Sequence, residues 1–403
     1  MDVHRIRARI VRVRLPQLRT DPFRHCNFRL RPGRHEQTLP HQSHLLYLIL
    51  NTSSLLSLSM VLEPPTGRWR RFYQAPEPFE RASVLYLAFS HPLKLLLLKL
   101  YHVLTYFRTA PAPSAPPVRV VCISDTHELT CEVPQGDVLI FAGDLTNCGS
   151  VQAIQKQVDW LASLPHQHIV VIAGNHDSYL DPRSRGSLAE SQRAGSVDWK
   201  RVHYLQHCSK TLNVAVQRSE SHSRDPLLRS GIRTLRVYGA PQIPACGPMS
   251  QFAFQYPRGL DAWSETVPED TDVLVTHTPP KSHLDLPLPD GQGCEYLLAE
   301  VKRVRPALHV FGHVHWGAGS TVCWWGHCQE AYERGMGVKT GWARGLLSHV
   351  LWRSIIGVVC SGVKELVWDK IWGGQGRSTV MVNAAQMKGN TGKLGNTVQV
   401  VVI

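Results

Sequence analysis

Five short polar motifs, each directly after an apolar run, contain the side chains that could do chemistry. The motifs are Asp125-Thr126-His127, Gly143-Asp144, Gly174-Asn175-His176-Asp177, Thr276-His277 and Gly312-His313-Val314-His315. One such motif arises often by chance and is more often structural than functional, but five in series indicate a shared site. The candidate metal ligands are two carboxylates, one amide and four imidazoles: Asp125, His127, Asp144, Asn175, His277, His313 and His315.

These nitrogen and oxygen donors, without a thiolate, suit divalent or transition metal ions such as Mn²⁺, Fe or Zn²⁺ better than Ca²⁺, and we favour Mn²⁺. Seven ligands exceed what one ion needs and suit two ions about 3.5–4 Å apart that share a carboxylate. Asp144 is the natural bridge, because a carboxylate has two oxygens with free lone pairs. A hydroxide bridging the two metal ions could then attack the phosphorus of a phosphate ester.

The leaving oxygen of such a reaction needs a proton, and the candidate catalytic residues lie beside Asn175. His176 follows a predicted ligand but is not needed as one, so we predict it to be the general acid. Asp177 could orient the His176 imidazole or stabilise its charge, although adjacent side chains on a turn can point apart. Both residues are therefore predicted to be catalytic.

Buried parallel strands must position these side chains. The segment before each motif is a short apolar run, typical of a strand buried in a parallel sheet, at 118–123, 137–142, 168–173, 272–276 and 307–311. Ligands bind at the carboxyl edge of open α/β sheets, where these runs end. Ser150 as an N-cap, followed by an apolar face, predicts a helix over 150–164, and a second helix is expected over 294–304. The fold class is therefore α/β.

A segment of 63 residues, 316–378, separates the last motif from the final apolar runs. Its aliphatic residues are accompanied by Trp342, Trp352, Trp368 and Trp372. This composition suits a lid or a membrane-interface helix, or else a helical hairpin packed on the domain, and we favour the packed hairpin. The runs at 379–383 and 398–403 are expected to form a closing hairpin.

The net charge of +13 belongs to the N-terminal part of the chain. Residues 1–117 contain 17 Lys+Arg against 6 Asp+Glu, whereas residues 118–403 contain 27 against 25. The basic residues lie apart from the motifs, so nucleic acid is not expected as a partner. The cysteines show no Cys-x-x-Cys pair, and no signal peptide is recognisable, so we expect a cytoplasmic protein, with membrane association as an open alternative.

We expect residues 1–80 to form a disordered basic leader, in which 45–62 is long enough to span a membrane but contains several polar residues. Residues 81–108 are predicted to be an amphipathic helical segment in which Pro92 could serve as the first helical residue, followed by leucines at helical spacing. That helix either lies on an anionic membrane surface or docks on the globular domain, and we favour docking. A Pro/Ala linker, 109–117, precedes the globular domain 118–403.

The five motifs resemble those of the calcineurin-like metallophosphoesterase superfamily. Additional residues resemble its branch of metallophosphoesterase-domain-containing proteins and their fungal relatives, at 122–127, 142–146, 275–280 and 308–313. The resemblance implies a four-layer α/β/β/α sandwich, here with a basic N-terminal leader and a helical insertion before the last strands. It also implies one ion held by Asp125, His127, Asp144 and His315, and another held by Asp144, Asn175, His277 and His313.

The branch resemblance implies a phosphodiesterase, with small cyclic nucleotides among the candidate substrates. The alternative is a phosphomonoesterase, including a protein phosphatase, but residues 143–147 lack the Gly-Asp-x-x-Asp-Arg-Gly run typical of that group. A non-catalytic membrane or protein scaffold is a third possibility. Candidate substrate contacts are Asn147, Tyr179 and His283, although such residues are more often structural.

Overall fold

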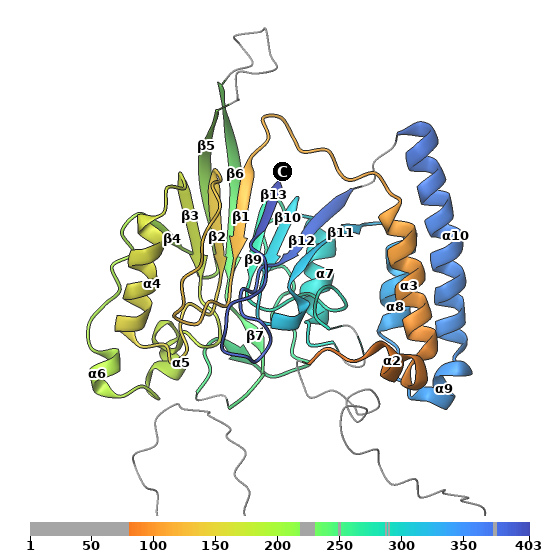
Figure 1. The fold of residues 1–403 in the computed structure, drawn as a ribbon, viewed down its shortest axis with the longest axis horizontal. Coiled ribbons are helices and arrows are strands. Elements are labelled where there is room, and N and C mark those ends of the chain that lie inside the picture. The colour runs from red at the N-terminus through yellow and green to blue at the C-terminus, as the bar shows by residue number, and fades with distance from the viewer. Residues whose placement is uncertain (1–79, 218–229, 249–250, 287, 289–290, 374–376) are drawn as a thin grey trace, which may run out of the picture. The chain divides into compact units, whose positions relative to one another are not determined.

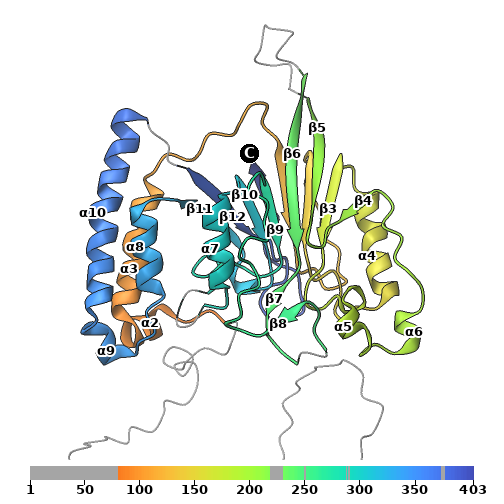
Figure 2. The same cartoon turned by 180° about the vertical axis from the view of Figure 1, so that it is seen from behind.

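A computed structural model describes residues 80–217, 230–248, 251–286, 288, 291–373 and 377–403. The first 79 residues, which include the apolar segment 45–62 and nearly all of the predicted leader, lie outside the described residues. The described chain contains two large β-sheets with helices on their outer sides (Figures 1 and 2). These sheets carry all five motifs.

The first sheet has the strand order β13-β1-β2-β3-β4. Its strands are β1 (Arg119–Ile123), β2 (Val138–Ala142), β3 (His168–Ile172), β4 (Val202–Tyr204) and β13 (Gln399–Val402). Strands β1 to β4 are parallel, whereas β13 pairs antiparallel with β1 at the edge. The carboxyl ends of β1, β2 and β3 therefore lie side by side.

The second sheet has the strand order β11-β12-β10-β9-β6-β5. Its strands are β5 (Cys208–Gln217), β6 (Ser230–Ala240), β9 (Val273–Thr276), β10 (Leu308–Phe311), β11 (Gly319–Trp324) and β12 (Ser378–Asn383). The four central strands are parallel, and both edge strands are antiparallel to their neighbours. A separate pair is formed by β7 (Ile243–Pro244) and β8 (Gln255–Tyr256).

The two sheets pack face to face, because side chains alternate between the faces of each strand. In β1, Val120 points into the core between the sheets, whereas Val121 packs beneath α4 (Val151–Ser163). In the second sheet, Val310 points into the shared core and Phe311 packs beneath α7 (Glu295–Val304). Helix, sheet, sheet and helix thus form the four-layer α/β/β/α sandwich that was predicted.

Both predicted covering helices have side-chain N-caps. Ser150 caps α4 by accepting a hydrogen bond from the N–H of Ala153 (3.2 Å), as expected. Cys294 occupies the equivalent position before α7. Shorter helical segments are η1 (Ser178–Leu180), α5 (Pro182–Arg185), α6 (Glu190–Arg193) and η3 (His315–Gly317).

A group of helices packs together to one side of the sandwich (Figures 1 and 2). It contains α2 (Val84–Ser90), α3 (Pro92–Tyr106), α8 (His327–Met336), α9 (Trp342–Leu346) and α10 (His349–Trp372). Leu97 and Tyr101 of α3 are buried with Tyr332 of α8 and Val358 of α10. Burial of this leucine-bearing face confirms docking of the segment, and the insertion helices are what it docks against.

The segment 81–108 differs from the prediction in having two helices instead of one. Helix α3 begins at Pro92, as expected, but α2 ends before it at Ser90. Proline has no N–H to donate and disfavours helical geometry in the residue before it. These two effects interrupt the helix at His91.

One expectation for the C-terminal part was incomplete and another was wrong. The insertion 316–378 contains the expected helices, but it begins with β11, which pairs with β12 as the edge of the second sheet. The final runs do not form a hairpin: β12 lies in the second sheet and β13 in the first. The connection between them is long enough to cross from one sheet to the other, and it passes the predicted metal ligands at Gly389.

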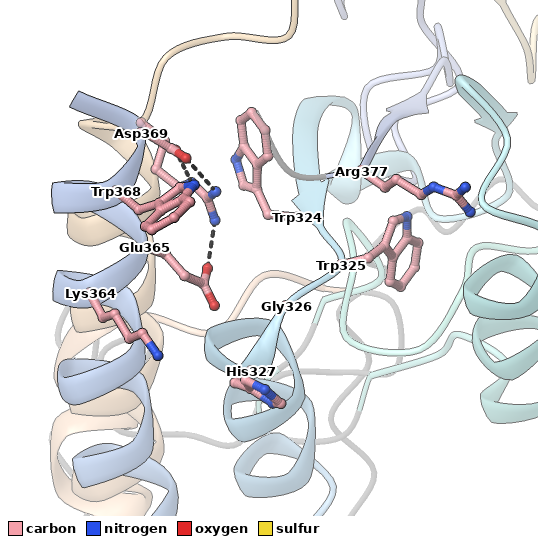
Figure 3. Close-up of a pocket in the computed structure, with 10 residues that line it drawn as sticks. Trp324, Trp325, Gly326, His327, Lys364, Glu365, Trp368, Asp369 and Arg377 are labelled. Carbon is pink, nitrogen blue, oxygen red and sulfur yellow. Dashed lines mark hydrogen bonds and ion pairs between the residues drawn. The ribbon is translucent and has the colours of Figure 1, made fainter. Parts of the chain in front are cut away.

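Arg108 links the end of α3 to α10. Its guanidinium pairs with Glu365 (2.6 Å) and Asp369 (2.7 Å) and stacks over the Trp324 ring at 4.2 Å. Figure 3 shows Glu365 and Asp369 on the side of α10 that faces Trp324. Among the described helices, none has the length and apolarity needed to cross a membrane.

Candidate metal centre

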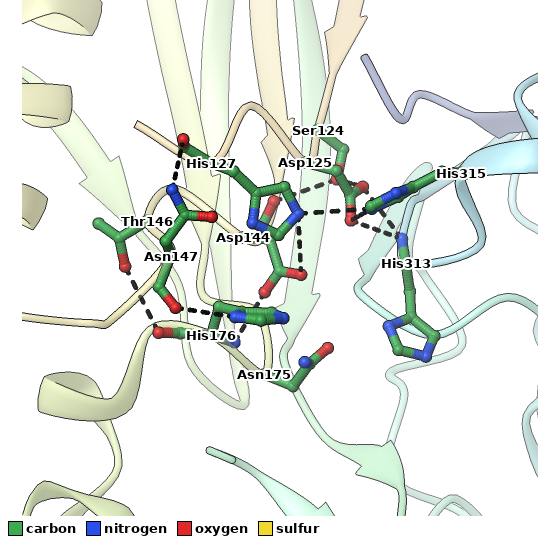
Figure 4. Close-up of polar contacts among 12 residues, drawn as sticks. Ser124, Asp125, His127, Asp144, Thr146, Asn147, Asn175, His176, His313 and His315 are labelled. Atoms are coloured by element: carbon green, nitrogen blue, oxygen red, sulfur yellow. Dashed lines mark hydrogen bonds and ion pairs between the residues drawn. The ribbon is translucent and has the colours of Figure 1, made fainter. Parts of the chain in front are cut away.

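The structure brings all seven predicted ligands together at the carboxyl ends of five strands. Asp125 and His127 follow β1, Asp144 follows β2, and Asn175 follows β3. His277 follows β9, and His313 and His315 follow β10. Figure 4 shows side chains from both sheets converging on one space. Their assignment as ligands stays a prediction.

Asp125, His127 and His315 form one cluster in which three possible ligand atoms lie within 4.8 Å of one another. The Nε2 atom of His315 is 3.4 Å from Asp125 Oδ1 and 3.4 Å from His127 Nε2. A second cluster of the same kind contains Asp144, His277 and His313. Each cluster combines carboxylate oxygen with imidazole nitrogen, which is the donor mixture that Mn²⁺, Fe and Zn²⁺ accept.

Asp144 lies between the two clusters. Its Oδ2 atom is 3.3 Å from His277 Nε2 in the second cluster and 3.8 Å from His127 Nε2 in the first. Asn175 belongs beside the second cluster, because its Oδ1 is 3.0 Å from His277 Nε2. Asp144 therefore lies near residues of both ligand sets that the family resemblance implied, and the division of the ligands between two ions stays a prediction.

Backbone carbonyls orient two of the imidazoles. His277 Nδ1 lies 2.8 Å from the carbonyl of Ala142, and His315 Nδ1 lies 2.8 Å from the carbonyl of Gly389. Because each Nδ1 donates its proton to a carbonyl, each Nε2 is directed into the cluster, an arrangement typical of metal-binding histidines. Sequence reasoning missed both anchors, since any residue type can supply a carbonyl.

Backbone N–H groups orient both carboxylates. The N–H of His313 lies 3.0 Å from both oxygens of Asp125, and the N–H of His176 donates to Asp144 Oδ1 (2.8 Å). The bonds to Asp125 link the motif after β1 to the motif after β10 in the other sheet. The bond to Asp144 links the motifs after β2 and β3, which are neighbours in the first sheet.

Two of the motif glycines are explained by close approach to these carboxylates. A Cβ atom on Gly174 would collide with the side chain of Asp144, and one on Gly312 would collide with the side chain of Asp125. Any other residue type would force the carboxylate away from its cluster. Glycine therefore precedes Asn175 and His313 for a steric reason.

Four of the seven predicted ligands have left-handed backbone geometry. Their φ angles are 52° for Asp125, 48° for His127, 57° for Asp144 and 66° for His313. Non-glycine residues adopt this region infrequently, and such strain is concentrated at functional sites. The sharp turns after β1, β2 and β10 fold these side chains back over the strand ends.

The acidic and basic groups stabilise each other's charges. Burial alone would raise the pKa of Asp144, but the neighbouring His277 and His176 hold it well below its ordinary value. Burial would likewise lower the pKa of His277, yet the charge of Asp144 raises it to about 9. Burial dominates at His313 and lowers its pKa to about 3. A carboxylate and a neutral imidazole are the forms that bind metal.

His176 lies beside the clusters without belonging to either predicted ligand set. It forms a group with His127 and Asp144 in which possible ligand atoms lie within 4.8 Å. Its Nδ1 is 2.9 Å from the carbonyl of Asn147, and its ring stacks edge-on against Phe252 at 5.0 Å. Its Nε2 makes no hydrogen bond with any described residue and remains available to a substrate.

Asp177 does not orient His176, which contradicts the role predicted for it. Its carboxylate accepts hydrogen bonds from the N–H groups of Gly174 (2.8 Å) and Thr146 (3.0 Å) and from the Thr146 hydroxyl (2.9 Å). Adjacent side chains on this turn point apart, so Asp177 joins the turns after β2 and β3. The group that orients His176 is the carbonyl of Asn147.

The three candidate substrate contacts have structural partners. Asn147 donates its side-chain N–H to the carbonyl of His127 (3.0 Å), and Tyr179 donates its hydroxyl to the carbonyl of Gly195 (2.7 Å). His283 is buried against Glu333 at 3.3 Å, away from both clusters. Of these three, only Asn147 touches the predicted centre.

A family model of the calcineurin-like phosphoesterases matches residues 118–317, the stretch that carries all five motifs. The chain is 38% identical over 222 residues to the UPF0046 protein C25E10.12 of Caenorhabditis elegans, covering 51% of this chain and 71% of that protein. It is 36% identical over 219 residues to human metallophosphoesterase domain-containing protein 1, covering 52% of this chain and 64% of that protein.

A fungal relative aligns over a longer stretch of the chain. This protein of Emericella nidulans, named "Probable rhamnogalacturonate lyase C", is 40% identical over 274 residues, covering 68% of this chain. The chain spans 23% of the length of that protein, and the lyase activity in the name is said of that protein alone. With the family match and the nematode relative, the conclusion is that the chain belongs to the calcineurin-like phosphoesterase family.

Proposed function

We propose that the chain is a dinuclear metallophosphoesterase that acts on phosphodiesters. The observation that carries the proposal is the position of Asp144 between two clusters of carboxylate and imidazole ligands. Asp125, His127, Asp144 and His315 would hold one ion, and Asp144, Asn175, His277 and His313 the other. When bound, two such ions neutralise phosphate oxygens and make hydroxide available near neutral pH.

The protein residues contribute orientation and proton transfer. The carbonyls behind His277 and His315 fix the direction of their Nε2 atoms, and the N–H groups of His313 and His176 fix the carboxylates. His176 has an available Nε2, and the carbonyl of Asn147 stabilises a proton on its Nδ1. Protonated on both nitrogens, His176 can give a proton to the leaving oxygen from Nε2.

A preference for diesters is supported by the sequence around Asp144. Residues 143–147 read Gly-Asp-Leu-Thr-Asn and lack the Asp-Arg-Gly continuation typical of protein phosphatases. The human relative carries only a domain name, which does not specify a substrate. Mn²⁺ is the ion that we propose, because histidine, carboxylate and amide ligands together suit it.

Two chromogenic substrates test the proposal. Metal-free chain should be assayed with bis-p-nitrophenyl phosphate and with p-nitrophenyl phosphate, before and after Mn²⁺ is added. We expect turnover only with metal, and a higher kcat/KM for the diester. A higher kcat/KM for the monoester would favour a phosphomonoesterase, and no turnover of either substrate at any metal loading would favour a non-catalytic scaffold.

A further inference from the structure

The outer face of α10 carries an apolar stripe that no described residue covers. The stripe consists of residues at helical spacing: Trp352, Ile356, Val359, Val363, Val367 and Ile371. Their exposed fractions run from 38% for Val359 to 64% for Ile371. The opposite face of α10 is buried against α3 and α8 (Figures 1 and 2). We call the six exposed residues the outer stripe.

The exposed charges around the outer stripe are all positive. Arg353, Lys364 and Lys370 are exposed on α10, and none of them forms an ion pair with a described residue. The two acidic residues of α10, Glu365 and Asp369, lie on its inner side, where Arg108 pairs with both (Figure 3). Their negative charge is thus neutralised within the protein. The outer face of α10 is therefore apolar and cationic.

Neighbouring helices continue this combination. Helices α2, α3 and α9 contain no acidic residue, and Arg344 of α9 is an exposed cation. Trp368 lies on the side of α10 that faces Trp324 (Figure 3), where it stacks on Trp372 at 4.9 Å, and both rings are more than half exposed. Tryptophan is enriched where proteins meet the boundary between lipid headgroups and acyl chains.

We propose that the outer stripe docks on the surface of an anionic lipid bilayer. Apolar residues would enter the headgroup boundary, while Arg353 and Lys370 would contact lipid phosphates or carboxylates. Because the inner face of α10 packs against protein, the helix would lie along the surface. This inference concerns attachment and does not depend on the reaction at the metal centre.

Charge argues against two other occupants of this face. A second copy of the chain placed on the outer stripe about a twofold axis would bring cations against cations. Residues 1–79, which contain 13 arginines and no lysine against five acidic residues, have the same sign of charge as the cations around the outer stripe. An anionic bilayer is the occupant that matches both the apolar and the cationic character.

Vesicle flotation with the full chain tests the proposal. The vesicles are phosphatidylcholine alone or a mixture of phosphatidylcholine and phosphatidylserine. We expect binding to the mixed vesicles, weakened about tenfold or more by Val363→Asp, because a carboxylate in the outer stripe would have to enter the headgroup boundary. The matched control is Ile232→Asp, which places the same charge on a 73% exposed position of β6 and should leave binding unchanged.

A second variant separates charge from apolar contact. Arg353→Glu combined with Lys370→Glu should weaken binding to the mixed vesicles by about tenfold or more, since each cation near an anionic surface contributes to binding. Residues 1–79 are basic and present in every variant, so the comparison between variants carries the result. Thermal unfolding of each variant checks that the fold is retained.

Three results would overturn the proposal. One is the absence of binding to mixed vesicles. Another is binding that Val363→Asp leaves at the wild-type level. The third is a dimer in lipid-free buffer that Val363→Asp converts to a monomer in sedimentation equilibrium, since that would identify a second copy as the occupant.

Discussion

At the scale of single residues, Asp144 has the most consequential position. Its carboxylate faces His277 at 3.3 Å and His127 at 3.8 Å, so its loss affects both clusters. Loss of a partner behind a metal ligand costs roughly 10–100-fold in affinity or activity, and we expect Asp144→Asn to exceed about 100-fold in kcat/KM. The control is Asp159→Asn, which removes an exposed carboxylate paired with Lys200. Equal losses in the two variants would contradict the assignment of Asp144.

Substitution of His176 should lower the rate of hydrolysis without changing the amount of bound metal. We expect His176→Ala to lower turnover by about 10²–10⁴-fold for diesters with poor leaving groups, because the leaving oxygen then lacks its proton donor. Diesters with good leaving groups should lose much less. Metal content, measured by mass spectrometry, should equal that of the wild type. A variant that no longer binds metal would show that His176 is a ligand instead.

His277 should release a proton when metal binds. In the metal-free chain its two nitrogens face the carbonyl of Ala142 and the side-chain oxygens of Asn175 and Asp144, and its pKa is raised to about 9. His277 is therefore protonated at pH 7, and a metal ion at Nε2 must displace that proton. Metal affinity should consequently rise with pH up to about 9.

Calorimetry in buffers of different ionisation enthalpy measures this release. Titration of metal-free chain with Mn²⁺ at pH 7 should release at least one proton per chain. No proton release between pH 6 and 8 would be inconsistent with a protonated His277. His277→Gln, which cannot carry that proton, is the matched variant and should release fewer protons than the wild type.

At the scale of elements, Arg108 is the connection between α3 and α10. Its side chain is 7% exposed, and Asp369, one of its two partners, is 2% exposed. Removing one member of a buried ion pair leaves the other charge uncompensated, so Arg108→Leu should lower the free energy of unfolding by about 3–5 kcal/mol. Urea unfolding measures this change, with the exposed Arg353→Leu as control. If Arg108→Leu lowers the free energy of unfolding by less than Arg353→Leu does, Arg108 does not connect α3 to α10 as described.

The strands that carry the ligands could be predicted because two signals coincide in them. An apolar run such as 307–311 indicates burial, and the polar motif that follows marks the end of the strand. The insertion was harder to predict, since β11 contains Thr321 and Ser320 among apolar residues and has no clear strand pattern. The separation of β12 and β13 into different sheets depends on tertiary packing, which local patterns do not encode.

Side-chain types identified the predicted ligands, but not the groups that orient them. The carbonyls of Ala142, Asn147 and Gly389 act through the backbone, and nothing in their residue types indicates that role. Asp177 directly follows His176 in the sequence, yet its side chain points away from His176 and binds the N–H groups of Gly174 and Thr146. Direction on a turn depends on backbone geometry that spacing alone does not give.

At the scale of the whole molecule, the sandwich and the helical group would have separate roles. The sandwich holds the predicted metal centre at its strand ends, and the helical group carries the outer stripe of α10. The net charge of +13 is mostly in residues 1–117, which leaves the sandwich nearly balanced.

The most direct test of the central claim is metal stoichiometry measured together with turnover. Metal-free chain should be loaded with increasing Mn²⁺, freed of excess ion, and analysed by mass spectrometry and by hydrolysis of bis-p-nitrophenyl phosphate. We expect the chain to saturate at two ions, with turnover that rises as the second ion binds. Saturation at one ion with full turnover, or hydrolysis by the metal-free chain, would contradict the proposal of a dinuclear centre.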